Sequence, residues 1–334
     1  MYKFRPYTQR IWDLRQEIRD RALYYESQRA VILTESYRKN QNMIPLIKRA
    51  LGVKDICAQI DIYVGDTELI VGSKGGHQFS CCPYPEWIND DWIVEFIENG
   101  VWKIGEDGHY HNPPGEEVMQ VMPVEDYEAI KSVRPYWDTW RLGAAADAWK
   151  PAEYYELARL NVSSYTEGGI GLGNLPAGHL ICGYEKIINT GYAAIRKEAQ
   201  DFIDSHYGNQ MGDDVNKCMF YHSVVITCDA ATGLVKRYAQ ACRDKSAALP
   251  EVGMMKEGLS YEGRKAELLR MADGLEWIAE NPARNFWEAV QLTMMYQILI
   301  HADSLLPGPA FGRFDYYTWP FLKKDLESGA LTED

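Results

Sequence analysis

The stretch NPARNFWEAVQLTMMYQILIH, residues 281–301, carries the strongest structural signal in the chain. Asn281-Pro282 interrupts the helical pattern that precedes it, because proline cannot continue the interior of a helix. The sequence from Phe286 onward is long and mainly apolar, which is typical of a helix packed inside a protein. We therefore predict a buried helix from Phe286 to about His301.

Helical patterns recur on both sides of this stretch. Apolar residues at three- and four-residue intervals, such as Ile11, Leu14 and Ile18, indicate an amphipathic helix. A second run stops at Gly52, because glycine commonly lies just past a helix end. The predicted helices cover residues 8–36, 45–51, 184–206, 215–247 and 260–280. The second half of the chain is therefore predicted to be mostly helical.

Strand-like sequence lies between the first helices and the middle of the chain. Residues 60–64 (IDIYV) and 68–72 (ELIVG) are rich in β-branched residues and flank the turn pair Gly65-Asp66. We predict a short strand, a turn and a second short strand. Residues 73–151 contain many prolines and predict a loop-rich region whose path the sequence does not define.

Length and composition restrict the class of protein. The 334 residues allow one large domain or two ordinary ones, and 46% hydrophobic with 25% charged residues is typical of a folded globular chain. The net charge of −13 disfavours binding to nucleic acid or to an anionic membrane. No uninterrupted apolar run reaches the length of a membrane span, and the first residues lack a signal-peptide core. We expect a cytoplasmic protein.

Two local patterns suggest a cofactor or metal site but lack the required context. The seven cysteines show no CxxC spacing, and Cys81-Cys82 on a strand would point to opposite faces, so we predict no metal site there. The glycine-rich stretch 165–173 (YTEGGIGLG) loosely matches a dinucleotide-binding fingerprint. Because Asn174-Leu175-Pro176 follows where a helix should start, we predict a plain loop.

Five groups of residues, in one order, resemble the glycyl radical enzyme family of the pyruvate formate-lyase-like type. They are RAVILTES (29–36), ELIVG (68–72) with PE (85–86), GH (178–179) with YEKI (184–187) and Gly191, NP (281–282) with FWEAVQL (286–292), and FGRFD (311–315) with Tyr317, Pro320 and Asp325-Leu326. The last two groups are the most specific. Together the groups extend over essentially the whole chain.

The resemblance implies a fold and a division of labour. The family's fold is a ten-stranded barrel wrapped by helices, so residues 1–334 are expected to form an α/β amino-terminal part, mostly helical, with only the start of the barrel. The family's catalytic cysteine, the glutamate two residues after it and the glycine radical loop lie beyond the equivalent of Asp334. The resemblance thus implies no cofactor in this chain, a radical installed elsewhere by a radical SAM activase, and a carboxy-terminal radical polypeptide, or a second copy, as partner.

The same resemblance suggests residues that face the substrate. His179 is the candidate catalytic residue, as a general acid or hydrogen-bond donor for a leaving group. A histidine held by backbone groups at a helix start is the alternative. Asp303, Ser304 and Tyr165 are candidate contacts for a small substrate, although a surface loop equally explains the first two.

Departures from the family pattern restrict the substrate. No arginine lies beside His179, which argues against pyruvate, and Gly183 replaces an acidic residue that often precedes the tyrosine of the YEK group. Pro307-Gly308 stands where glycerol-dehydratase-like members have a His-Ser pair, so glycerol is disfavoured.

Other residues around these groups are expected to be structural. Arg313 and Asp315 are predicted to form a buried ion pair, because a charge inside a barrel needs compensation. Gly312 would permit close approach of another stretch of backbone. His109 and His111 are interpreted as belonging to a hydrated surface loop rather than to a metal site.

The end of the sequence leaves two hypotheses open. Thr332 is a good helix N-cap followed by acidic residues, so a helix is expected to begin there. The chain is then either part of a glycyl radical lyase, dehydratase or decarboxylase, or a non-catalytic binding protein derived from that family. The first hypothesis predicts an exposed apolar face for the missing part, and the second a polar or self-associated face.

Overall fold

The computed structural model describes residues 8–19, 21–87, 91–116, 118–139, 141, 144, 148, 151, 153, 180–206, 211–304 and 309–332. The elements of the first half are α1 (Gln9–Arg19), β1 (Leu23–Tyr25), α2 (Gln28–Lys39), α3 (Pro45–Gln59), β2 (Ser80–Cys81), α4 (Asp91–Glu98), β3 (Lys103–Ile104), β4 (His109–His111), β5 (Gln120–Pro123) and α5 (Val124–Trp137). Those of the second half are α8 (Tyr184–Ser205), α9 (Asp213–Ala248), β6 (Met254–Lys256), β7 (Leu259–Ser260), α10 (Tyr261–Ile278), α11 (Phe286–Asp303) and α12 (Phe314–Glu327).

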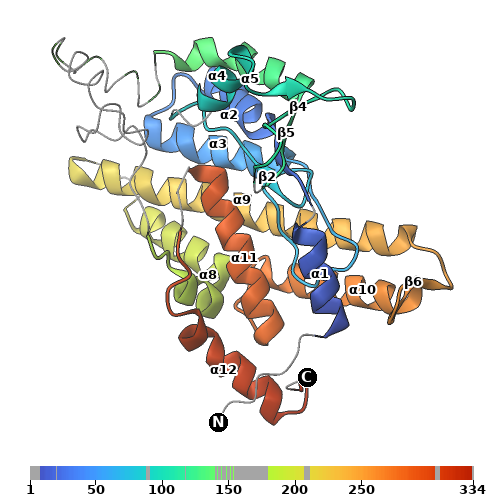
Figure 1. Cartoon of the computed structure of the whole chain (residues 1–334). Coiled ribbons are helices and arrows are strands. Elements are labelled where there is room, and N and C mark those ends of the chain that lie inside the picture. Colours follow the sequence, from blue (N-terminus) through green and yellow to red (C-terminus); the bar gives the residue numbers. More distant parts are fainter. Residues whose placement is uncertain are drawn as a thin grey trace.

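The larger of two cores is built by helices. α9 runs through the middle of the molecule and packs against α3, α8 and α10, while α11 crosses it (Figure 1). Fully buried side chains from these helices, such as Ile56, Leu234, Leu268 and Leu292, meet in this core. Burial of so many apolar side chains is the main favourable term for the helical part.

The smaller core lies under a mixed sheet at one end of the molecule, with α4 and α5 beside it (Figure 1). The strand order is β2-β1-β5-β4-β3, in which β1 pairs in parallel with β2 and β5, and the remaining pairs are antiparallel. α2 separates the two cores, because its Ala30 belongs to the small core and its Leu33 to the large one.

The predicted helices of the second half are confirmed. α8, α9 and α10 lie within two residues of the predicted bounds at each end, and α11 extends two residues past His301. The predicted burial of α11 is also confirmed along most of its length. Ser260 and Asn285 cap α10 and α11, since their side-chain oxygens accept hydrogen bonds from the amides of Gly263 and Glu288.

The prediction of strands at residues 60–72 is wrong, because this segment is irregular although all of it is described. Helix side chains supply the hydrogen bonds that a partner strand would have made. The Gln291 side chain accepts a hydrogen bond from the Val71 amide and donates one to the Val71 carbonyl. The Tyr238 hydroxyl makes the same two hydrogen bonds with the backbone of Ser73. Five further backbone carbonyls accept hydrogen bonds from helix side chains: Ile60 from Arg237, Val64 from Lys245, Gly65 from Arg264, Thr67 from Arg10 and Leu69 from Trp287.

Two helix boundaries near the amino terminus are also wrong. Residues 8–36 are not one helix, because β1 lies between α1 and α2, where Tyr24 pairs with Ser80 and Val121. Gly52 does not end a helix, since α3 continues to Gln59. A Cβ at Gly52 would lie 2.6 Å from the Leu33 side chain, so glycine permits α2 and α3 to approach each other. The burial of Ile56 further along α3 outweighs the low helix propensity of Gly52.

One helix in the described part of the chain, α9, is long and apolar enough to cross a membrane by length and composition alone. This was not expected from the sequence. A core helix meets the same criterion, and most of the buried residues of α9 belong to the large core.

Candidate functional site

The carboxyl end of α11 is held by a buried arginine from α2. The Arg29 side chain is 2% exposed, and its Nε and Nη2 donate to the carbonyls of Ala302 and Asp303 at 3.1 and 3.2 Å. Glu86 compensates the charge with contacts of 3.1 and 2.5 Å, and the guanidinium lies 3.9 Å from the centre of the Tyr84 ring. A cation here satisfies carbonyls left free at a helix end and offsets the negative pole of the helix dipole.

The predicted substrate contacts Asp303 and Ser304 lie at this helix end. Asp303 is the last residue of α11, and its two carboxylate oxygens accept from Nε and Nη2 of Arg49 on α3 at 2.6 and 2.7 Å. Ser304 is 6% exposed, and its amide donates to the Ile300 carbonyl at 3.0 Å. The Asp303 carboxylate is thus already engaged by an arginine, and Ser304 is buried rather than in a surface loop.

His301, in the last turn of α11, was missed by sequence reasoning. Its carbonyl accepts from the Tyr84 hydroxyl at 2.7 Å, Nε2 lies 3.2 Å from Gln297, and Nδ1 is buried without a hydrogen-bond partner among the described residues. Burial lowers its pKa to about 4, and the positive charges of Lys74 and Arg29 add to that effect. His301 is therefore neutral at neutral pH. Only its burial distinguishes it, which the sequence does not show.

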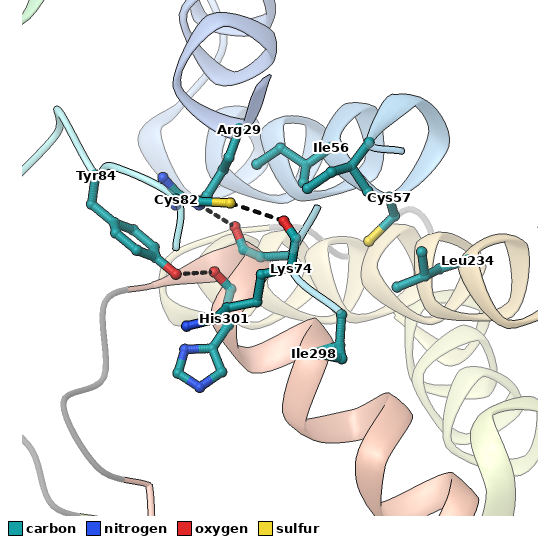
Figure 2. Close-up of a pocket in the computed structure, with 11 residues that line it drawn as sticks. Arg29, Ile56, Cys57, Lys74, Cys82, Tyr84, Leu234, Ile298 and His301 are labelled. Atoms are coloured by element: carbon teal, nitrogen blue, oxygen red, sulfur yellow. Dashed lines mark hydrogen bonds between the residues drawn. The ribbon is translucent and has the colours of Figure 1, made fainter. Parts of the chain in front are cut away.

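Two cavities adjoin this helix end. The first lies among Arg29, Lys74, Cys82, Tyr84 and His301 (Figure 2) and has a volume of about 10 Å³, room for at most one water. The second, of about 450 Å³, opens between α3, α9, α11 and the segment just before α8. Its size suits a small-molecule site. Among the residues that line it are Arg49, Cys182, Ser223, Thr227, Tyr296 and Asp303.

A single parallel bridge joins Ile181 to Ala310, beside this second cavity. The Ala310 amide donates to the Leu180 carbonyl at 3.0 Å. Gly312 comes next with a φ of +64°, and a Cβ there would lie 2.8 Å from Ile181. Gly312 thus permits the close approach of the Ile181 side chain, rather than of another stretch of backbone. This bridge joins two segments that are far apart in sequence. One lies within the GH…YEKI group and the other directly precedes the FGRFD group.

The predicted burial of the Arg313–Asp315 pair is wrong. The two side chains do pair at 3.1 Å, but they are 75% and 73% exposed. They lie at the start of α12, with Arg313 just before its first residue, on the outside of the described fold. Water solvates both charges there, so neither needs a buried partner.

Other family-like groups also meet in the structure. Gly191 has φ +76° and ψ 164°, and a Cβ on it would lie 2.5 Å from the backbone of Asn281, so the NP turn fits into the kink of α8. Asp325 on α12 accepts from the Phe286 amide at 2.7 Å, at the start of α11. These contacts join α8, the NP turn, the start of α11 and α12 to one another.

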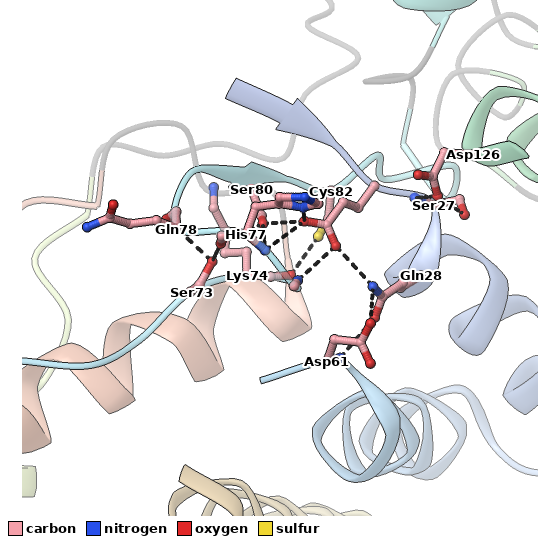
Figure 3. Close-up of polar contacts among 12 residues, drawn as sticks. Ser27, Gln28, Asp61, Ser73, Lys74, His77, Gln78, Ser80, Cys82 and Asp126 are labelled. Atoms are coloured by element: carbon pink, nitrogen blue, oxygen red, sulfur yellow. Dashed lines mark hydrogen bonds and ion pairs between the residues drawn. The ribbon is translucent and has the colours of Figure 1, made fainter. Parts of the chain in front are cut away.

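The buried carboxylate of Glu26 organises the loop 73–80, whose Lys74 lines the small cavity at the carboxyl end of α11 (Figure 3). Glu26 accepts from the Gly76 amide at 2.8 Å, His77 Nδ1 at 2.9 Å and the Ser80 hydroxyl at 2.5 Å. The His77 ring stacks on Tyr24 with 3.8 Å between ring centres. No local pattern signals this cluster, because Glu26 lies about 50 residues away from its partners in sequence.

Several predicted residues lie elsewhere. His179, Tyr165 and the glycine-rich stretch 165–173 are outside the described residues. His109 and His111 form β4 rather than a loop, and Asp107 holds His111 at 2.8 Å. In the part of the chain that the structure describes, no three His, Cys, Asp or Glu side chains gather to hold a metal ion.

The fold and these contacts define a helix-rich α/β protein whose candidate site lies at the carboxyl end of a core helix. The family model described as pyruvate formate lyase-like matches residues 7–334. The chain therefore belongs to the pyruvate formate lyase-like family of glycyl radical enzymes and corresponds to an amino-terminal part of it.

Individual relatives agree with this assignment. The chain is 26% identical to the isethionate sulfite-lyase of Oleidesulfovibrio alaskensis, over 99% of this chain and 38% of the relative. It is 25% identical to the (2S)-3-sulfopropanediol dehydratase of Klebsiella oxytoca, over 98% of this chain and 37% of the relative. The glycerol-bound glycerol dehydratase of Clostridium butyricum superposes with a TM-score of 0.80 at 26% identity, over 96% of this chain and 37% of that structure. The chain thus spans little more than a third of these relatives.

Proposed function

We propose that this chain frames the substrate cavity of a glycyl radical lyase or dehydratase and that a further, carboxy-terminal part supplies the radical chemistry. That part either continues the same polypeptide or is a second chain. The proposal rests on the family assignment and on the chain's coverage of 37 to 38% of its curated relatives. A radical SAM activase would install the glycyl radical in the carboxy-terminal part.

The observation that carries the proposal is a set of exposed apolar side chains in the two segments that meet at the Ile181–Ala310 bridge and in the first turns of α12. Large apolar side chains on a soluble protein seldom gather in this way unless something covers them. We call this surface the bridge face; it consists of Leu180, Ile181, Phe311, Tyr316 and Trp319, which are 54%, 69%, 44%, 64% and 52% exposed. An isolated bridge also offers unpaired backbone groups to which further strands can add.

The role of the chain in the reaction would be positioning and exclusion of water. Radical intermediates need a site closed to solvent, and residues near the bridge would hold a small substrate there. His179 remains the proposed general acid, with Tyr165 and Ser304 as proposed substrate contacts. The Asp303 carboxylate is better suited to orienting Arg49. The substrate would be a small molecule with a C–O, C–N, C–S or C–C bond to cleave.

The net charge of −13 supports a protein that acts on small molecules rather than on nucleic acid or anionic membranes, and we propose a cytoplasmic location for it. The alternative function is that of a non-catalytic binding protein whose bridge face is closed by a second copy of the chain. Both functions use the same surface, so the composition of the complex distinguishes them.

The experiment is anaerobic isolation of the tagged chain from its native source, followed by intact-mass analysis. Wild type should carry a sequence with a cysteine two residues before a glutamate and an RVAGY-like loop, as a bound partner or as a continuation above 38.2 kDa. If the partner is a second chain, Trp319→Glu should reduce its recovery at least about tenfold, whereas the matched variant Phe220→Glu, also 52% exposed but on α9, should not. A self-dimer or a bare monomer of 38.2 kDa would contradict the proposal.

A further inference from the structure

A chain of hydrogen bonds fixes which nitrogen of His301 carries the proton. The Tyr184 hydroxyl donates to Oε1 of Gln297, so the amide nitrogen of Gln297 faces His301 and lies 3.2 Å from its Nε2. An amide nitrogen donates and does not accept, so Nε2 of His301 is the acceptor. In a neutral imidazole the other nitrogen then carries the hydrogen. His301 therefore presents Nδ1–H as a donor.

This donor has no acceptor. Nδ1 of His301 is buried and makes no hydrogen bond to any residue that the structure describes. A buried donor left unpaired costs free energy, and native chains seldom contain one without a reason. The His301 side chain lines the small cavity at the carboxyl end of α11, whose volume of about 10 Å³ admits a single oxygen atom (Figure 2).

Lys74 lines the same cavity and also lacks a partner. Within the described ranges its ammonium group makes no hydrogen bond or ion pair, and only its carbonyl is engaged, by the Cys82 thiol. Its positive charge helps to lower the pKa of His301, so the two groups lie close together. The other cation at this cavity, Arg29, is compensated by Glu86. One uncompensated positive charge and one unpaired donor thus adjoin the cavity.

This combination favours an anionic oxygen as the ligand. Hydrogen bonds to an ionised acceptor are stronger than those to a neutral one, and an ammonium group attracts the same charge. Glu26, the carboxylate buried beside the same loop, already accepts three hydrogen bonds from that loop. The size of the cavity requires a group that projects one oxygen, as the end of a carboxylate or a sulfonate does. Lys74 and His301 are only partly buried, which leaves an approach from outside.

We propose that Lys74 and His301 form a binding site for one oxygen of a carboxylate or sulfonate group. Gln297 and Tyr184 are positioning residues, because they make Nδ1 of His301 the donor. The site is a property of this chain alone. Its natural ligand would be an anionic group of the small-molecule substrate or an acidic side chain of the carboxy-terminal part, and this assignment rests on the proposed function.

The experiment is nuclear magnetic resonance of the imidazole nitrogens in the full 334-residue chain at neutral pH. Without ligand, His301 should show the tautomer with the proton on Nδ1. Acetate, the probe, should then shift the Nδ1 signal along a saturating curve, whereas chloride at equal ionic strength should not.

Three variants separate the roles of these side chains. Lys74→Met should weaken acetate binding at least about tenfold, because the only uncompensated charge at the cavity is lost. Gln297→Met removes the donor to Nε2, so the proton of His301 should distribute over both nitrogens even without acetate. The matched control is Lys197→Met, which removes the same charge from an exposed position on α8 and should bind acetate as wild type does.

Three results would overturn the inference: a wild-type His301 with its proton on Nε2, equal shifts with acetate and chloride, or undiminished acetate binding in Lys74→Met. The native complex distinguishes the two sources of the anion. If the carboxy-terminal part fills the site, His301 should already show the bound shift there and acetate should not change it; if the substrate does, acetate should still bind. Because the measurement on the chain alone needs neither, its failure is distinguishable from a failure of the proposed function.

Discussion

Two buried arginines, Arg29 and Arg264, are each compensated by a carboxylate, and each also bonds a backbone carbonyl far away in sequence. Arg29 meets Glu86 and the end of α11, and Arg264, fully buried, donates to the Gly65 carbonyl and to Glu267. Burying a charge is costly unless it is paired and hydrogen-bonded. Individual residues therefore decide how the helices and the irregular segments fit together.

Replacing Gly191 should lower the free energy of unfolding strongly, although the change adds only one methyl group. Its φ of +76° and ψ of 164° fall in a region that is open almost only to glycine, and a Cβ would strike the backbone of Asn281. Gly191→Ala should lower the free energy of unfolding by at least about 2 kcal/mol, measured by denaturant titration.

A matched glycine provides the control for this prediction. Gly233 lies exposed within α9 with open space around its Cα, so Gly233→Ala should raise stability by about 0.5 to 1 kcal/mol. Equal effects of the two substitutions would show that the kink at Gly191 is not required.

His301 makes stability depend on pH. Its pKa is about 4 in the folded chain and 6.5 as the ordinary value, so between these values the unfolded chain binds a proton that the folded chain does not. Stability should thus fall as the pH drops from 6.5 to 4, by about 2 to 3 kcal/mol. In His301→Gln this part of the pH dependence should be absent from denaturant unfolding curves; an unchanged slope would mean that His301 is solvated.

Two helices, α10 and α11, begin at a residue whose side-chain oxygen accepts a hydrogen bond from an amide of the first turn. α11 is the clearest case, because Asn285 accepts from the Glu288 amide at 2.9 Å and Asp325 accepts from the Phe286 amide. Through Asp325 the start of α11 is tied to α12, just as its end is tied to α2 and α3.

Loss of the Asn285 cap should therefore weaken α11 as a unit. Asn285→Ala is expected to lower the free energy of unfolding by about 1 kcal/mol, whereas Asn285→Ser, which keeps a capping oxygen, should cost much less. Thermal unfolding followed by circular dichroism measures both. If serine were as damaging as alanine, Asn285 would act through packing and not through the cap.

The helices of the second half could be predicted because period, length and flanking residues agreed. α9 and α11 are examples, since their apolar patterns extend over many turns. Gly52 shows the opposite case, where contact with Leu33 outweighs local propensity. The segment 60–72 failed for a similar reason, because its hydrogen-bond partners are helix side chains some 200 residues away.

The candidate site was predictable only where a motif located it. The FGRFD group allowed us to predict a close approach at Gly312. It also allowed us to place Asp303 near the site, because Asp303 lies a few residues before that group in the sequence. The pairing of Arg29 with Glu86, 57 residues apart, and the burial of His301 depend on tertiary packing. Neither leaves a local signal, so sequence reasoning could not find them.

The molecule as a whole combines a closed core with an open side. The helical core is continuous through α3, α8, α9, α10 and α11, while the bridge face exposes five large apolar side chains. The relatives of this chain are more than twice as long as it is. A carboxy-terminal part that covers the bridge face and carries the radical glycine would explain both facts.

The most direct test is electron paramagnetic resonance of the native complex, isolated and activated without oxygen. We predict an organic radical on a glycine of the covering part, present when this chain is bound and lost when that glycine is replaced by alanine. A complex that contains this chain with its bridge face covered, yet forms no glycine radical under activating conditions, would contradict the proposed function.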